Sequence, residues 1–330
     1  MKPTVSVCIV TYNHEKYIAE AIESVLQQKA DFKYEIVIGE DCSTDGTREI
    51  VSDYQRRYSE LIRPRFRERN IGMMENFSLT IQECKGKYIA LLDGDDYWTD
   101  PLKLRKQVEY LDNNPDLVAC FHNTLVTCES DGYTTAVVLN KDQKPFSTIE
   151  DFIEQEWFFG TATVLFRNGL VNGLPATLKK ASSGDWPLYV LLSQYGKFGY
   201  LDEVMSVYRI HGNSVTRSSV FNSKNSFLSR LYIYEGLNEA LGFKYERLFR
   251  KKMLAVRYAL LKIALNENDD GALKDCLREC VGNLGVFNWR QRIVIILCQI
   301  KQSLPNLFFL LHRLLEFARL KSRVYRVADE

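Results

Sequence analysis

The sequence predicts an α/β protein: a mostly parallel sheet flanked by helices, with an appended C-terminal helical lobe. In the first half of the chain, short apolar runs that end in polar loops alternate with segments whose apolar residues recur every three or four positions. Such a repeat is typical of right-handed β-α-β crossovers and a parallel sheet. From Asn225 onward only the helical periodicity remains, so we expect one domain at 1–222 and a helical region at 223–330.

Composition and charge set the broad class of protein. The chain has 330 residues, 46% of them hydrophobic, which is enough for a full core. Its 43 lysines and arginines against 42 aspartates and glutamates give a net charge of +1, so we expect no nucleic-acid partner. The run Val5 to Val10 is too short for a secretory segment, and we expect a cytoplasmic protein.

The eight cysteines form no Cys-x-x-Cys pair, and we expect reduced thiols. Cys276 and Cys280 lie one helical turn apart, but no histidine lies close by in sequence to complete a zinc site. We therefore do not predict zinc.

The first two strands end in polar loops. Val5 to Val10 is rich in β-branched residues and leads into Thr11-Tyr12-Asn13, and a helix of about 15–28 follows. Tyr34 to Gly39 is the second strand, and it leads into the loop Glu40 to Thr47. Because parallel strands end at the same edge of a sheet, both loops are expected to face one crevice.

A third strand ends in an acidic cluster. Tyr88 to Leu92 reads as a buried strand, and Asp93-Gly94-Asp95-Asp96 opens its carboxyl end. Asp93 and Asp95 form an Asp-x-Asp motif around a glycine, so both can turn toward one hard cation such as Mg²⁺ or Mn²⁺. The alternative is an acidic turn before a helix at 101–114, with Asp100 as N-cap and Pro101 at the first helical position. That alternative explains Asp100 but leaves the cluster Asp93, Asp95 and Asp96 unexplained.

The three polar loops together predict a nucleotide pocket. Asp41 can accept from the N–H of a uracil-like base, and Tyr12 can stack on its face. The alternative is that Ser43, Thr44 and Asp45 only cap the next helix, and capping and binding are compatible. Arg69, in the loop before the helix at 73–84, either meets a phosphate or is a solvated arginine. No glycine-rich dinucleotide or P-loop motif occurs.

The residues quoted so far resemble family 2 glycosyltransferases. The matching stretches are Val5 to Ile18, Glu40 to Thr47, Asn70-x-Gly72 and Leu92 to Trp98, in the family's order and spacing. The resemblance implies the GT-A fold, a nucleotide-diphosphate sugar donor, a divalent cation and inversion at the anomeric carbon. It is sharp over Lys2 to Val126, thinner to Val215 and absent beyond.

The resemblance also implies roles for residues. Thr11, Tyr12 and Asp41 would hold the base with Asn13 beside them, Asp93 the ribose or the metal, and Asp95 the metal through the diphosphate. One departure is Glu40-Asp41-Cys42, where the family often has Asp-Asp-Gly. The backbone freedom of the loop at Cys42 is therefore open.

The second part of the domain, 127–222, is expected to shape the acceptor side. A strand at Leu117 to Thr127 and a hairpin near Glu129 to Gly132 come first, and Trp157, Phe158 and Phe159 either stack on a sugar or, as we favour for most of them, pack in the core.

Later in the chain, three carboxylates and one imidazole are further candidate site residues. In Ser182-Ser183-Gly184-Asp185-Trp186, Asp185 either caps the next helix or, as the resemblance implies, is the catalytic base. Asp202 and Glu203 are weaker candidates for the base. His211, in the stretch Tyr208 to Ser214, is implied as a further ligand near the cation and is otherwise structural.

The last helices alternate apolar runs with basic residues, and no uncharged run is long enough to span a bilayer. A basic amphipathic helix on an anionic membrane surface fits this pattern, and so does packing on the sheet domain or a partner subunit. The basic residues are Arg290, Arg292, Lys301, Arg313, Arg319, Lys321, Arg323 and Arg326.

The sequence as a whole predicts an enzyme that transfers a sugar to a hydroxyl of a glycan or lipid-linked glycan during surface polysaccharide assembly, and we expect a UDP-sugar as the donor. A nucleotidyltransferase and a non-catalytic sugar-binding scaffold on the same fold are the alternatives. We expect a cytoplasmic location, with peripheral attachment to the inner face of the cell membrane.

Overall fold

The computed structural model describes residues 2–130, 133–138, 143–156, 158–178, 181, 184–212 and 223–303. Contacts within the chain divide it into two compact units. The first comprises Met1–Phe221 and Tyr232–Leu248, and the second comprises Asn222–Leu231 and Phe249–Glu330. Helix α8 (Lys224–Ala240) contributes to both units.

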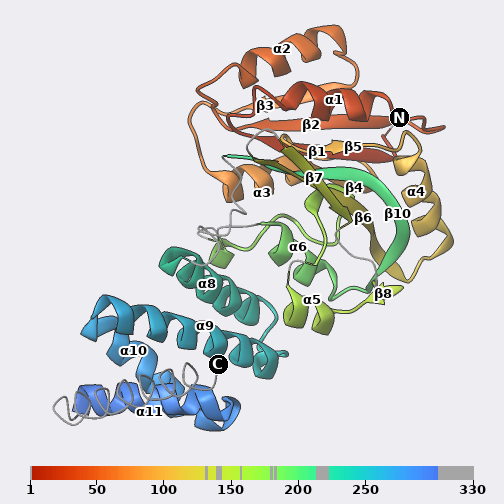
Figure 1. Ribbon diagram of the computed structural model, residues 1–330. Coiled ribbons are helices and arrows are strands. Elements are labelled where there is room, and N and C mark those ends of the chain that lie inside the picture. Colours follow the sequence, from red (N-terminus) through yellow and green to blue (C-terminus); the bar gives the residue numbers. More distant parts are fainter. Residues whose placement is uncertain are drawn as a thin grey trace, which may run out of the picture. The chain divides into compact units, whose positions relative to one another are not determined.

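A ten-stranded sheet forms the frame of the first unit (Figure 1), in the order β3-β2-β1-β4-β9-β6-β10-β5, with β7 paired to β6 and β8 to β10. Strands β3, β2, β1 and β4 pair in parallel, and so do β6 and β10, whereas β5, β7, β8 and β9 pair antiparallel. The strands are β1 Val5–Thr11, β2 Tyr34–Glu40, β3 Ile62–Phe66, β4 Tyr88–Asp93, β5 Tyr97–Trp98, β6 Leu117–Ser130, β7 Tyr133–Val138, β8 Phe146–Ser147, β9 Leu165–Arg167 and β10 Lys197–Ile210.

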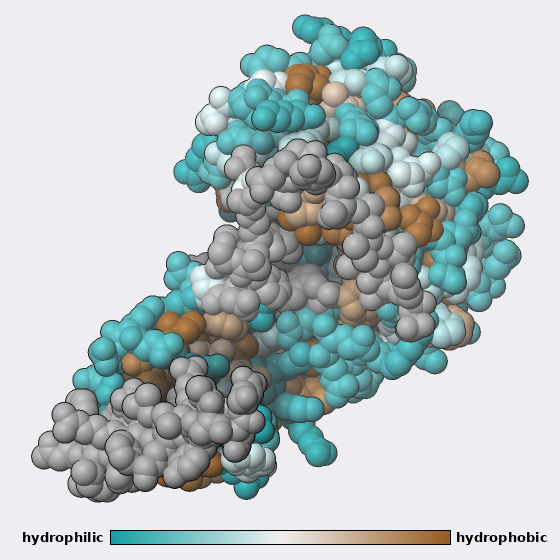
Figure 2. All heavy atoms as spheres, viewed as in Figure 1, coloured by the Kyte–Doolittle hydropathy of each residue, from teal (hydrophilic) through white to brown (hydrophobic). Residues whose placement is uncertain are grey.

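Helices cover both faces of the parallel strands. In Figure 1, α1 and α2 lie above β1 and β2, and α3 lies below them. On the side of the sheet that α1 and α2 cover, the core contains alternate strand residues such as Val7 and Ile9. Apolar side chains of α1, α2 and α4 pack against them. Mostly hydrophilic residues cover the outer side of α1 and α2 (Figure 2). The helices of this unit are α1 Ile18–Leu26, α2 Thr47–Arg57, α3 Met73–Glu83, α4 Lys103–Asn113, α5 Ile149–Gln155 and α6 Asp185–Leu192, with short 3₁₀ turns η1 Thr161–Thr163 and η2 Ala176–Leu178.

The second unit is helical in its described part. Besides the start of α8 it contains most of α9 (Glu246–Glu267), and then α10 (Asp270–Val281), the 3₁₀ turn η3 (Leu284–Val286) and α11 (Trp289–Ser303). The predicted loops near Gly242, 266–271 and 282–288 fall at the ends of these helices. Among the described residues, no helix is long and apolar enough to cross a membrane.

Two predicted helix starts were wrong. Helix α4 begins at Lys103 and not at Pro101, because Asp100 Oδ1 accepts a hydrogen bond from the backbone N–H of Leu102 (2.8 Å) and holds a turn there. Helix α1 begins at Ile18 and not at Glu15. The backbone N–H of Glu15 donates to Asp45 Oδ2 (3.1 Å), which keeps this residue in the loop.

The direction of chain progression across the sheet reverses between β1 and β4. From β1 the chain adds β2 and then β3 on one side, and β4 pairs with the other side of β1. Ligands of open α/β sheets bind in the crevice outside the carboxyl ends of the strands at such a switch point. Val10 is in register with Asp93, so the loop after β1 and the acidic loop after β4 are neighbours at that crevice.

Candidate active site

The acidic loop lies directly against the end of β1. The backbone N–H of Gly94 donates to the carbonyl oxygen of Val10 (2.9 Å). A Cβ added to Gly94 would lie 2.6 Å from Thr11 Oγ1 and 2.9 Å from His14 Nδ1, closer than side chains approach. The glycine of the Asp-x-Asp motif is therefore required by this close approach as well as by the bend of the loop.

Asp95 contacts two histidines. Its Oδ2 lies 3.1 Å from His211 Nε2 and 3.8 Å from His14 Nε2. Burial alone would raise the pKa of Asp95, but the hydrogen bond with His211 and the charges of both histidines bring the pKa below its usual value. His211 follows β10 and is 5% exposed, with its ring 4.6 Å from that of Tyr17. The structure thus brings the predicted Asp95 and His211 together.

Asp93 and Asp96 are more deeply buried carboxyl groups. Burial is the main reason that the pKa of Asp93 is raised to about 8, and the charges of Asp95 and Asp185 add to the rise. Asp96 is 1% exposed, and burial also raises its pKa well above the usual value. Its Oδ1 accepts from the backbone N–H of Arg209 (2.9 Å), whereas Oδ2 has no hydrogen-bond partner in the described part of the chain. Asp96 therefore joins the acidic loop to the end of β10.

Arg209 strengthens the same junction. Its guanidinium donates to the carbonyl oxygen of Asp95 (2.8 Å), pairs with Glu20 of α1, and lies over the rings of Tyr17 and Tyr97. Arg209 and His14 were not among the predicted site residues. His14 directly follows the polar tip of β1 and Arg209 stands two positions before His211, so their neighbours could have indicated both.

The residues predicted for the base occupy two adjoining loops. Tyr12 is 42% exposed, which leaves a ring face open to a ligand, whereas Thr11 is buried and its Oγ1 lies 3.3 Å from His14 Nδ1. Asn13 adopts a left-handed backbone conformation (φ 56°), and its Oδ1 accepts from the backbone N–H of Thr44 (2.8 Å). Asn13 thus ties the loop after β1 to the loop after β2.

Asp41 holds a third loop. It is 2% exposed, and its two carboxylate oxygens accept from the backbone N–H groups of Ile71 (2.8 Å) and Gly72 (2.9 Å). Burial raises the pKa of Asp41, and these two hydrogen bonds oppose the rise. Cys42 takes a φ of 58°, so the departure from glycine puts a strained residue in the loop, at a cost of roughly 1–2 kcal/mol.

Arg69 is exposed, and its side chain makes no hydrogen bond or ion pair within the described part of the chain. The structure does not bring it into contact with the acidic loop. Its predicted phosphate contact stays a prediction.

Asp185 is the first residue of α6, and Gly184 occupies the N-cap position that the capping interpretation gave to Asp185. Asp185 Oδ2 accepts from the hydroxyl of Thr161 (3.2 Å), and Oδ1 accepts from the backbone N–H of Trp186 (2.7 Å). Ser182 and Ser183 of this motif lie outside the described residues, as do Asn213 and Ser214 of the His211 motif.

Tyr189 lies one helical turn after Asp185. It is 2% exposed, and the side chain of Thr161 lies near its hydroxyl. Burial, followed by the charges of Asp185 and Asp93, raises the pKa of Tyr189 well above its usual value. Both carboxylates are therefore close enough to act on one buried hydroxyl. The spacing of four residues between Asp185 and Tyr189 places both on one helix face, and this spacing is visible in the sequence.

Other acceptor-side candidates have separate partners. Phe159 is 7% exposed and stacks on Phe121 at 4.2 Å, so it packs in the core as favoured. Trp157 lies outside the described residues. Asp202 and Glu203 lie on an exposed part of β10, where Asp202 accepts from the hydroxyl of Tyr200 (3.0 Å) and Glu203 pairs with Lys106.

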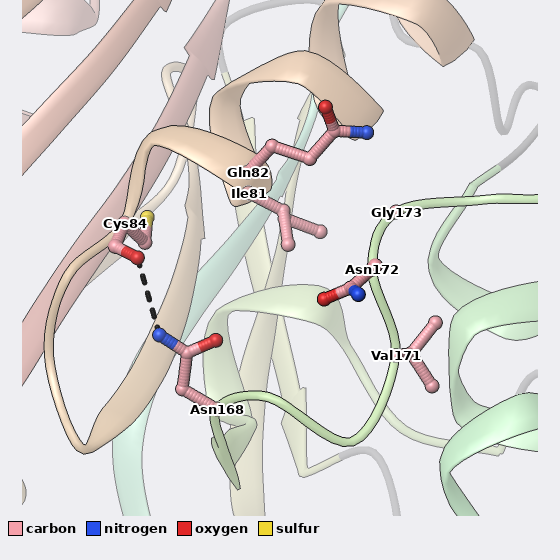
Figure 3. Close-up of a pocket in the computed structure, with 7 residues that line it drawn as sticks. All are labelled: Ile81, Gln82, Cys84, Asn168, Val171, Asn172 and Gly173. Carbon is pink, nitrogen blue, oxygen red and sulfur yellow. Dashed lines mark hydrogen bonds between the residues drawn. The ribbon is translucent and has the colours of Figure 1, made fainter.

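A pocket of about 320 Å³ lies at the opposite end of β4 (Figure 3). Asn168 donates to the carbonyl oxygen of Cys84 across it (3.1 Å). Tyr88, at the start of β4, pairs with Arg167, whereas Asp93 ends the strand. None of the pocket's residues is charged, so it offers no group for a diphosphate or a cation. They are Ile81, Gln82, Cys84, Asn168, Val171, Asn172 and Gly173.

Comparison with known proteins gives the family. The model of Glycosyl transferase family 2 matches residues 6–169. The chain is 34% identical over 225 residues to the uncharacterized protein Rv1520 of Mycobacterium tuberculosis, covering 68% of this chain and 64% of that protein. It is 30% identical over 217 residues to the uncharacterized glycosyltransferase MJ1057 of Methanocaldococcus jannaschii, covering 63% of this chain and 71% of that protein. The chain belongs to glycosyl transferase family 2.

A shorter match and two solved structures complete the comparison. The putative teichuronic acid biosynthesis glycosyltransferase TuaG of Bacillus subtilis is 39% identical over 110 residues, 33% of this chain and 42% of TuaG. Residues 1–349 of TarS from S. aureus, in complex with UDP-GlcNAc, superpose with a TM-score of 0.59 at 18% identity, covering 92% of this chain and 88% of that one. The mannosyltransferase PcManGT of Pyrobaculum calidifontis, with GDP-Man and Mn²⁺, gives 0.50 at 16% identity, with the same coverage. The predicted GT-A fold is confirmed.

Proposed function

We propose that this protein is an inverting, divalent-metal-dependent glycosyltransferase that moves a sugar from a UDP-sugar to an acceptor hydroxyl. The observation that carries the proposal is the proximity of two carboxylates of different loops. The charge of Asp185 acts on Asp93 at the switch point, and Asp95, two residues further on, contacts His211. Asp93, Asp95 and His211 suit a diphosphate and its cation, whereas Asp185 suits an acceptor hydroxyl.

The donor base would lie between the loops after β1 and β2. Tyr12 offers an exposed ring for stacking. Asp41 is held in place by the N–H groups of Ile71 and Gly72, and each of its oxygens retains a second lone pair that can accept from the imide N–H of uracil. A UDP-sugar is therefore our proposed donor. TarS, which shares the fold, was crystallised with UDP-GlcNAc.

The residues of the acidic loop fit a hard divalent cation in their donor chemistry. Among the described residues, no three histidine, cysteine, aspartate or glutamate side chains are grouped as a complete metal site. Mg²⁺ and similar ions are usually bound by one or two carboxylates, with waters and substrate phosphates as further ligands. Asp95, Asp93 and His211 would hold the ion, and it would neutralise charge on the departing diphosphate. A structure of PcManGT contains Mn²⁺.

Asp185 is our proposed catalytic base. Inversion requires the acceptor oxygen to attack from the side opposite the leaving diphosphate, and its proton must pass to a nearby base. The bond from the anomeric carbon to the acceptor oxygen forms while the bond to the diphosphate breaks. Asp185 Oδ2 takes the proton, and Thr161, which donates to this oxygen, orients the carboxylate.

We further propose an acceptor on a glycan or lipid-linked glycan, in the assembly of a surface polysaccharide. The similarity to TuaG over 110 residues supports this proposal. Reaction at the inner face of the cell membrane would follow from a lipid-linked acceptor.

A screen of nucleotide sugars tests the proposal. The full chain is incubated with each donor, with and without Mn²⁺ or Mg²⁺, and with candidate acceptors. We expect nucleoside diphosphate release that requires the cation, and an acceptor heavier by one sugar in mass spectrometry. Pyrophosphate release from a nucleoside triphosphate would indicate a nucleotidyltransferase instead. Tight donor binding without any turnover would indicate a sugar-binding scaffold.

A further inference from the structure

Helix α11 of the second unit has an exposed apolar face. Trp289, Ile293 and Ile296 are 66%, 48% and 45% exposed, and their spacing of four and three residues places them on one side of the helix. Ile295 and Cys298, on another side, are fully buried. Large apolar side chains gathered on one exposed face mark an interaction surface more often than scattered ones do.

The same helix carries positive charge and no carboxylate. Its charged residues are Arg290, Arg292 and Lys301. None of the three forms an ion pair within the described part of the chain: Arg290 lies over the ring of Trp289 (5.2 Å), Arg292 donates to the carbonyl oxygen of Phe287 (2.7 Å), and Lys301 donates to Asn268 Oδ1 (3.2 Å). Their charges are therefore available to an anionic partner.

The charge bias continues along the sequence. Residues 289–326 contain eight lysines and arginines and one glutamate, although the whole chain has 43 basic and 42 acidic residues. This local excess disfavours a second copy of the chain as the occupant of the face, because two such segments would repel one another. It favours a partner that is both apolar and anionic.

We propose that α11 lies on the surface of an anionic phospholipid bilayer, with Trp289, Ile293 and Ile296 inserted between the headgroups. Helices of this kind have an apolar face with tryptophan and a polar face with arginine and lysine. They lie at the level of the lipid headgroups, because their basic side chains can reach the lipid phosphates. The proposed attachment is peripheral, because α11 would lie along the bilayer surface and not across it. This inference goes beyond the proposed function, because it does not depend on the reaction.

The experiment is co-sedimentation of the full chain with vesicles. Phosphatidylcholine vesicles are compared with vesicles that also contain phosphatidylglycerol. We expect binding to the anionic vesicles alone, and weaker binding at high salt because the charges are screened. Equal binding to both kinds of vesicle, or to neither, would overturn the proposal whatever the behaviour of any variant.

Variants then locate the surface. We expect the triple variant Trp289→Ser, Ile293→Ser, Ile296→Ser to bind anionic vesicles at least about tenfold more weakly. The matched control replaces three exposed apolar residues of the first unit by serine: Phe146, Tyr195 and Val204, which are 46%, 57% and 43% exposed. Equal loss in both variants would refute the assignment to α11. A change of oligomeric state in the α11 variant, with vesicle binding intact, would assign the face to a second copy of the chain.

Discussion

His211 Nε2 lies 3.1 Å from Asp95 Oδ2, a contact between residues 116 positions apart in the chain. Two positions earlier in β10, the backbone N–H of Arg209 donates to Asp96, the neighbour of Asp95 (2.9 Å). The end of β10 and the acidic loop are therefore joined by two adjacent carboxylates. Residues from both halves of the sheet domain therefore position any group that Asp95 binds.

Asp95→Asn should remove most metal-dependent turnover. Asparagine keeps the shape of the side chain but loses the charge that a divalent ion requires, so we expect kcat to fall at least about 100-fold. The variant should still fold, but its melting temperature should be lower at neutral pH, because the lowered pKa of Asp95 means that His211 and His14 stabilise its charge in the folded protein. Steady-state rates and thermal unfolding of the same preparation measure both effects. Full activity in a folded variant would exclude Asp95 as a metal ligand.

Thr161→Val should slow turnover. The change removes the hydroxyl that donates to Asp185 Oδ2. A hydrogen bond to a charged group contributes about 1.5–3 kcal/mol, which corresponds to a kcat lower by roughly tenfold to 100-fold.

Thr163→Val is the matched control for this prediction. Thr163 lies in the same 3₁₀ turn, but its hydroxyl donates to the carbonyl oxygen of Gly160 (2.7 Å) and not to Asp185. Its variant should lose stability and keep turnover. Equal kcat values in the two variants would mean that Thr161 has only a structural role.

Lys103→Met should change how stability depends on pH. Lys103 is fully buried in α4, with Nζ 2.7 Å from Gln107 Oε1, and burial lowers its pKa from 10.5 to about 7. Above pH 7 the folded lysine has lost its proton while the unfolded one still holds it. Stability therefore rises with pH through this window, by at most about 1.4 kcal/mol per pH unit.

The measurement is the free energy of unfolding of both proteins between about pH 7 and pH 9. The difference, wild type minus Lys103→Met, should increase with pH, because groups common to both proteins cancel. A difference that stays constant over this window would show that Lys103 keeps an ordinary pKa. The lost hydrogen bond to Gln107 shifts the level of the difference but not its slope.

The local sequence pattern was enough to predict the strands and much of the candidate site. The strand ending at Asp93 and the loops after β1 and β2 follow from alternation of apolar runs and polar loops, a signal carried by neighbouring residues. The contacts that complete the site are long-range. Neither the donation from Thr161 to Asp185 nor the use of both Asp41 oxygens by Ile71 and Gly72 leaves a periodic trace in the sequence.

The wrong start of α1 has the same physical origin. Apolar spacing predicted α1 from Glu15, but the backbone N–H of that residue is bound by Asp45, which belongs to a loop 30 residues away. Single-sequence patterns locate a helix face well and a helix end poorly, because ends depend on which distant group binds the first N–H groups.

Asp185→Asn tests the central claim most directly, by donor affinity and turnover measured on the same variant. Asparagine can still accept from Thr161, but it cannot take the acceptor's proton, so kcat should fall by about 10²–10⁴ while the Kd for the donor changes little. Asp202→Asn, on the exposed part of β10, is the matched control and should keep kcat. Weakened donor binding with turnover preserved at saturating donor would contradict the account, because Asp185 would then be a binding residue and another group would take the proton.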